Sequence, residues 1–156
     1  MLKRTTALAN TLAAALKTDL DAGFLFLYAG TVPATADEAL DLVAVHTEVL
    51  KVSNNGGVTG LTFEAPANGV LAKEETEVWK GTVTFDGFDD AETTLTPTFY
   101  RFCPAGDNGR GVANASTGYR IQGTVGGPSS GADLVLGTTT VTAGNEQPVG
   151  AFAYRF

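Results

Sequence analysis

The stretch Gly118–Gly144 constrains the fold most, because its first part alternates as only a β-strand does. Apolar and polar residues take turns from Tyr119 to Val125, and period two with β-branched residues is typical of a half-buried strand. The following run 126–131, Gly-Gly-Pro-Ser-Ser-Gly, ends that strand, because proline lacks the ladder N–H and glycine loses the most backbone entropy. Leu134–Val141 is predicted as a second strand. None of this stretch is chemically reactive.

The same patterns predict strands along most of the chain. We expect Phe24–Ala29 to be covered on both faces, because it is almost wholly apolar. The other expected strands are Leu42–Val52, Leu61–Phe63, Val70–Lys73, Val78–Phe85, Leu95–Cys103 and Val149–Phe156. Within them, Trp79 is expected in the core. Strong turn signals separate them, as at 53–57, Ser-Asn-Asn-Gly-Gly.

Two helical segments are predicted near the N-terminus. Thr6–Leu20 carries a leucine at every fourth position, a threonine cap at its start and a glycine stop at Gly23. Its apolar stripe is narrow, so it packs either on the edge of its own sheet, which we favour, or on a partner subunit. Thr35–Leu40 begins with a threonine followed three residues later by Glu38, the pattern of a capping box, and predicts one or two helical turns.

The order of these elements predicts a mainly β fold. A chain of 156 residues with 19 glycines and only 17% charged residues favours one domain of strands and turns. No βαβ spacing is visible, so the expected architecture is a single-domain antiparallel β-sandwich or jelly roll with an N-terminal α-helix. An arm and helix would occupy residues 1–22 and the β-sandwich residues 23–156.

Charge and cysteine content exclude several classes of function. The net charge of −7 argues against binding nucleic acid through a basic face. The single cysteine, Cys103, excludes an intrachain disulfide and a multi-cysteine metal site. No apolar run approaches the roughly 18–20 residues of a membrane span, and no segment has the pattern of a signal peptide. We therefore expect a soluble protein made in the cytosol, without nucleic-acid or membrane partners.

Two parts of the chain resemble a known family. The matching segments are 120–126 (Arg-Ile-Gln-Gly-Thr-Val-Gly), 131–134 (Gly-Ala-Asp-Leu) with the threonine-rich strand and Ala-Gly pair after it, and 25–33 (Leu-Phe-Leu-Tyr-Ala-Gly-Thr-Val-Pro) with the alanine-rich 34–40. They are similar to small virion structural proteins of tailed bacteriophages, some of which are capsid cement (decoration) proteins with a jelly-roll-like fold. The matches cover about a third of the chain and consist of turn and strand residues.

The resemblance implies a structural role on the outer surface of a phage capsid. The expected partner is the major capsid protein, which the chain would bridge and stabilise as a dimer or trimer, after synthesis in the bacterial cytoplasm. One departure concerns the loop Pro104–Thr117, which is longer than the family's usual connection around an Asp-Gly or Asn-Gly turn. It joins two arginine-bearing strands that are predicted to pair as a hairpin. Alternative functions are a tail, adaptor or tip protein, or a carbohydrate-binding module.

No catalytic, cofactor or metal site is predicted, and we do not expect an enzyme. His46 is the only histidine, so no second histidine completes a zinc site. A pair of Cys103 with His46 is conceivable as an activated thiol, but no sequence feature supports it. The acidic residues do not match a calcium-loop pattern and are expected to be solvated; they are Glu74, Glu75, Glu77, Asp86, Asp89, Asp90 and Glu92. The glycine-rich runs lack the residues of a phosphate loop. A sugar site would need exposed aromatic residues, for which Tyr100, Tyr119 and Tyr154 are the candidates.

Overall fold

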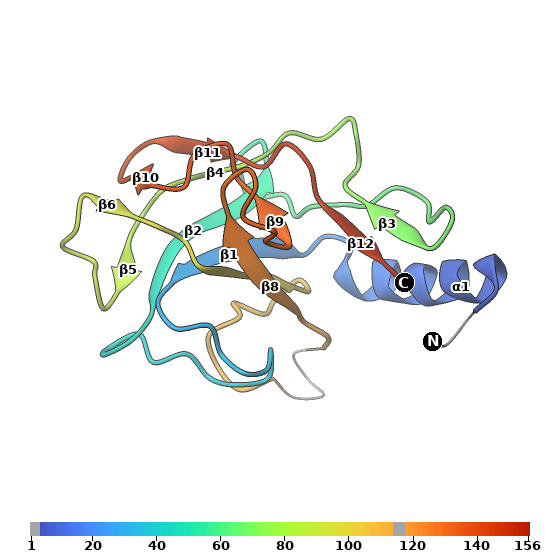
Figure 1. The fold of residues 1–156 in the computed structure, drawn as a ribbon, viewed down its shortest axis with the longest axis horizontal. Coiled ribbons are helices and arrows are strands. Elements are labelled where there is room, and N and C mark those ends of the chain that lie inside the picture. Colours follow the sequence, from blue (N-terminus) through green and yellow to red (C-terminus); the bar gives the residue numbers. More distant parts are fainter. Residues whose placement is uncertain (1–3, 114–117) are drawn as a thin grey trace.

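The computed structural model describes residues 4–113 and 118–156. Met1–Lys3, the start of the expected arm, and residues 114–117 of the expected loop lie outside the described residues. The chain is mainly β, with one N-terminal helix and a curled, mostly antiparallel sheet that forms a half-barrel (Figure 1). The elements are α1 (Thr6–Leu20), β1 (Phe24–Ala29), β2 (Thr47–Asn54), β3 (Val70–Ala72), β4 (Trp79–Thr82), β5 (Asp86–Gly87), β6 (Thr94–Leu95), β7 (Phe99–Cys103), β8 (Ile121–Gly126), β9 (Leu134–Val135), β10 (Val141–Thr142), β11 (Glu146–Pro148) and β12 (Ala153–Arg155).

Strand β1 lies in the middle of the largest sheet, whose order is β11-β4-β2-β1-β7-β8-β9. Its side chains are buried on both faces, as the apolar sequence predicts: Leu25 and Leu27 belong to the main core, whereas Phe26 and Tyr28 pack with Phe99 of β7 on the other face. Strands β7 and β8 pair antiparallel, which confirms the predicted hairpin. The central strand therefore has apolar residues to bury on each side of the sheet.

Aromatic rings fill the main core. Trp79, which is 1% exposed, packs against Phe63, Phe102 and Phe152 with ring centroids 5.6–5.8 Å apart. These rings come from β4, β7 and two irregular segments, so they tie distant parts of the chain together. The prediction that Trp79 is a core residue is confirmed.

The predicted helix is confirmed with the same bounds, and Thr5 caps it by accepting the N–H of Leu8 on its side chain. Its buried residues are Ala9, Ala13 and Leu20, and Leu16 is half-buried. The helix thus packs on its own domain, beside β3. Gly23 does not provide the left-handed stop, because Ala22 takes that conformation with φ 64°.

Several predicted strands are shorter than the sequence indicates. Leu42–Val52 is a strand only from Thr47, because the Asp41 carboxylate accepts the N–H groups of Val43 and Ala44 and closes a turn there. Leu134–Val141 reduces to the ends β9 and β10, and β9 pairs parallel to β8 rather than antiparallel. The other shortened segments are Leu61–Phe63 (isolated bridges), Val78–Phe85 (β4), Leu95–Cys103 (β6 and β7, separated by residues 96–98) and Val149–Phe156 (β12).

Among the described residues, no helix has both the length and the apolar character needed to span a membrane.

Candidate interaction surface

Two loops meet over one face of the sheet and form a surface that we call the loop face, made of residues 31–46, 104–113 and 118–120. Backbone hydrogen bonds join the loops directly: Leu40 N–H donates to the Arg110 carbonyl at 2.7 Å, and Ala113 N–H donates to the Asp37 carbonyl at 3.0 Å. In Figure 1 the two loops lie side by side below β1 and β8. Residues far apart in the sequence therefore make one continuous surface.

A buried arginine of β7 holds the loop face to the sheet. Arg101 is 0% exposed. Its guanidinium donates to the Gln122 side chain at 2.9 Å and to the carbonyls of Glu38 at 2.8 Å, Gly109 at 2.7 Å and Thr35 at 3.3 Å. Burial, with Arg120 nearby, lowers the pKa of Arg101 from its usual value. All four of these acceptors are uncharged, so this side chain links β8 and both loops without a direct salt bridge.

A second arginine makes a buried ion pair beside the first. Arg120 donates Nε to Asp107 Oδ2 at 2.5 Å and Nη2 to Oδ1 at 2.8 Å, and both side chains are at most 3% exposed. It also donates to the carbonyls of Ala36 and Gly111. Burial acts to raise the pKa of Asp107, but hydrogen bonds from Arg120 and from the Gly109 N–H outweigh it, so the pKa is lowered. The bidentate geometry is the strongest form of such a pair.

The arginines explain why the predicted helical turns at Thr35–Leu40 are wrong: the segment contains bends and turns but no helix. The carbonyls of Thr35, Ala36 and Glu38, which a helix would use for its own ladder, accept guanidinium protons instead. Part of the capping box survives, since Glu38 Oε1 accepts the Thr35 N–H at 3.0 Å. Distant side chains have replaced the local hydrogen bonds.

His46 holds the end of the first loop. Its Nε2 lies 2.8 Å from the Thr31 carbonyl, and its Nδ1 accepts the Asp41 N–H at 3.0 Å. The imidazole also packs edge-on against Phe99, with centroids 5.8 Å apart. Both ring nitrogens therefore serve the backbone of the loop.

Cys103 ends β7 beneath the second loop and is fully buried. Gly109 approaches it so closely that an added Cβ there would lie 2.9 Å from Sγ. Burial, and after it the charge of Asp107, raises the pKa of the Cys103 thiol to about 12. This thiol packs as a small apolar group and stays protonated near neutral pH.

Of the acidic residues expected to be solvated, Glu75, Asp86, Asp90 and Glu92 are exposed as expected, whereas Glu77 is half-buried. Asp86 and Glu48 pair with Arg110 at 2.5 and 2.8 Å, which fixes the rim of the loop face to β2 and β5. Glu77 accepts the Trp79 indole N–H at 2.8 Å and the Thr62 N–H at 2.9 Å. Within the described residues, no group of three or more potential metal ligands lies together.

The loop face exposes apolar side chains. The exposed fractions are 40% for Val32, 88% for Val43, 38% for Val45, 63% for Val112 and 66% for Tyr119. Of the other tyrosines proposed for sugar binding, Tyr100 is 3% exposed and Tyr154 lies on β12. The three tyrosines therefore do not form one exposed platform.

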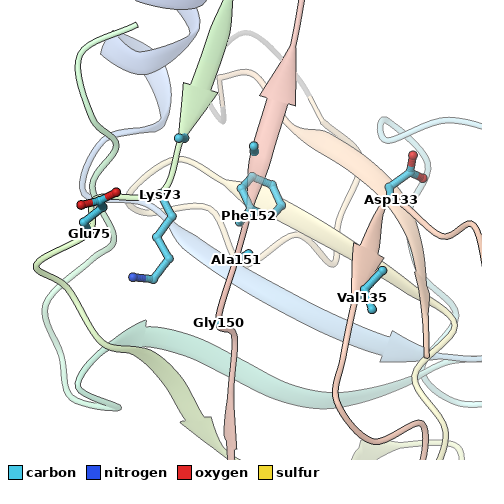
Figure 2. A pocket seen from close by; sticks show the side chains of 9 residues that line it. Lys73, Glu75, Asp133, Val135, Gly150, Ala151 and Phe152 are labelled. Carbon is cyan, nitrogen blue, oxygen red and sulfur yellow. The ribbon is translucent and has the colours of Figure 1, made fainter. Parts of the chain in front are cut away.

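An open groove of about 750 Å³ lies between β12 and β9. Figure 2 shows Lys73 and Glu75 on one side, Asp133 and Val135 on the other, and Phe152 between them. Lys73 Nζ already donates to the Glu74 and Glu77 carbonyls, and the Asp133 carboxylate accepts the backbone N–H and hydroxyl of Thr124. These two charged side chains serve the fold.

No family model, curated protein or solved structure matches this chain. The sequence reasoning also missed the buried roles of Arg101, Arg120 and Asp107. A signal was present, because an arginine stands in the middle of the apolar run Phe99–Cys103, where a charge must find partners if the strand is buried.

Proposed function

We propose that this chain is a structural protein of a tailed-phage virion, a capsid cement protein that binds the major capsid protein through the loop face. The observation that carries the proposal is the set of exposed apolar side chains on loops that buried arginines hold in place. Exposed apolar side chains gathered on one surface commonly mark a binding site for another protein. The resemblance of segments 25–33, 120–126 and 131–134 to phage virion proteins suggests the identity of the partner.

The arginine contacts favour binding by a preformed surface. Arg101 and Arg120 fix the loops through their carbonyls, so the loops lose little conformational entropy when a partner covers them. Val43 and Val112, the most exposed valines of the loop face, would then be buried against the shell. Each valine side chain fully buried contributes about 1.5–3 kcal/mol.

The mechanism is mechanical rather than chemical. A protein that binds only the assembled shell stabilises that state by mass action, and weak contacts repeated across a lattice gain strength through avidity. In this proposal the chain lies on the outer surface of the capsid, bridges neighbouring subunits as a homo-oligomer, and has the jelly-roll fold of the resembling family. It is made in the bacterial cytoplasm, and the proposal assigns it no catalytic or metal role.

The test compares two equally exposed valines. Val43 is 88% exposed on the loop face, and Val58 is 93% exposed in the turn after β2. Both are changed to aspartate, and binding to expanded, empty capsids of the encoding phage is measured by co-sedimentation. We expect Val43→Asp to lose at least tenfold in affinity and Val58→Asp to retain it.

Equal binding by both variants would remove the loop face from the interface. Cryo-electron microscopy of the intact virion decides the location independently: density for the chain on the shell supports the proposal. Density on the tail would overturn it in favour of a tail or adaptor protein.

A further inference from the structure

The exposed face of α1 is unusually poor in charge. No charged residue occurs from Thr5 to Leu16, although helices on protein surfaces normally carry charged residues on the face opposite the core. Leu8 is 50% exposed and Leu12 is 42% exposed. Figure 1 shows α1 at one end of the molecule, where β3 and β12 lie beside it. The helix thus buries one face on its own domain and leaves a second apolar stripe uncovered.

The residues of that second stripe are regularly spaced, and the stripe ends in one charged residue, Asp19. Leu8, Leu12, Ala15 and Asp19 follow one another at spacings of four, three and four residues, which places them on one side of the helix. All four are exposed. Thr11 lies beside the stripe, and its hydroxyl donates to the Ala7 carbonyl at 3.0 Å, which leaves its methyl group as a contact surface.

The stripe is complementary to itself when one copy is reversed. We consider a second, antiparallel helix related to the first by a twofold axis that passes between Thr11 and Leu12. This helix places Leu8 opposite Ala15 and Thr11 opposite Leu12. A large residue opposite a small one allows two helices to approach closely. Arg4, which is exposed just before the helix cap, then comes opposite Asp19.

This arrangement repeats each contact twice. A twofold axis requires that if residue i meets residue j, residue j also meets residue i. Each end of the helix pair therefore carries one arginine–aspartate contact, and the antiparallel helix dipoles also attract each other. A parallel pair would instead place arginine next to arginine and aspartate next to aspartate.

We propose that a second copy of this chain packs against α1 as an antiparallel helix pair centred between Thr11 and Leu12. A helix of this length extends about 22 Å, so the pair alone buries less than the roughly 1,200–2,000 Å² of a standard stable interface. The dimer is accordingly weak, with a dissociation constant in the micromolar range. The inference depends on α1 alone and does not require the capsid proposal.

The experiment measures the mass of the full chain by sedimentation equilibrium from about 1 to 500 μM in buffer of moderate salt. We expect a monomer–dimer equilibrium for the unmodified chain. Leu12→Glu should remain monomeric across the range, while Ala14→Glu, which adds the same charge at an exposed position of α1 off the stripe, should dimerise as the unmodified chain does. Thermal melting of each variant confirms that the fold is retained.

A charge exchange tests the orientation. Arg4→Glu should weaken dimerisation at least tenfold, because glutamate then faces Asp19, and adding Asp19→Arg should restore it. Persistence of the dimer in Leu12→Glu, a trimer, a monomer at every concentration, or strengthening by Arg4→Glu would each overturn the proposal.

Discussion

Removing the negative charge of Asp107 should destabilise the protein strongly. An Asp107→Asn side chain keeps an acceptor for the Gly109 N–H but turns an amide donor toward the donors of Arg120. Two guanidinium groups, those of Arg101 and Arg120, then remain buried with no carboxylate in direct contact. The cost follows from leaving a buried charge without its partner, which amounts to about 3–5 kcal/mol.

This loss is large relative to the stability of ordinary domains, about 5–15 kcal/mol. At about 2–4 °C per kcal/mol for a chain of this size, the melting temperature should fall by about 6–20 °C. The matched control is Glu146→Gln, because Glu146 pairs with Lys80 at 2.8 Å while remaining 62% exposed. An exposed pair contributes at most about 1 kcal/mol.

The assay is thermal unfolding of both variants and of the unmodified chain, followed by circular dichroism at pH 7, with urea unfolding as a second measure of the free energy. The reasoning predicts a clear separation between the two amide variants. If Asp107→Asn melts within 2 °C of Glu146→Gln, the buried pair does not anchor the loops.

Three further measurements test other parts of the structure. Because the pKa of Asp107 is lowered in the fold, its contribution to stability is complete above about pH 4 and is lost as the pH falls through the lower, folded pKa. Asp107→Asn should therefore lose less stability in acid than the unmodified chain does. Parallel curves of unfolding free energy against pH for the two proteins would contradict this. The Cys103 thiol should resist a thiol reagent at pH 8 in the native protein and react fully in denaturant; rapid native labelling would show that it is accessible. Gly81→Ala should cost at least about 1–3 kcal/mol, because its Cβ would lie 2.1 Å from the Lys51 carbonyl, whereas Gly137→Ala meets nothing within 4 Å and should unfold in urea like the unmodified chain.

Local patterns predicted the elements whose hydrogen bonds are local. The helix Thr6–Leu20 has its cap and its bounds as expected, and the turn at 53–57 places Asn55 and Gly56 at positive φ. The leucine period nevertheless indicated only part of the buried face, because Ala9 and Ala13 are covered while Leu8 and Leu12 are exposed. The small side chains of Ala9 and Ala13 face the domain and let the helix pack beside β3. A prediction based only on the spacing of leucines does not identify this alanine face.

The candidate surface could not be predicted because its hydrogen bonds are long-range. The capping-box pattern at Thr35–Glu38 is present, but the carbonyls there are taken by Arg101 and Arg120, more than sixty residues away. The parallel pairing of β9 with β8 could not be predicted either. It depends on the course of the chain between the two strands, and the alternation of residues within Leu134–Val135 carries no information about strand direction. The alternation of polar and apolar residues around Arg120 indicated that Arg120 faces solvent. In the structure the first loop folds over Arg120 and buries its side chain.

The central position of β1 has a consequence for biosynthesis. One edge of Phe24–Ala29 pairs with β2, which leaves the ribosome soon afterwards, but the other edge pairs with Phe99–Cys103. Until that later segment emerges, the nascent chain displays an apolar strand edge with unpaired backbone groups, the kind of edge on which chains aggregate. The interval is spent making β3 to β6, none of which pairs with β1. The yield of folded protein should therefore depend on how fast the segment between β2 and β7 is translated. It should also depend on whether a chaperone shields the edge of β1 during that time.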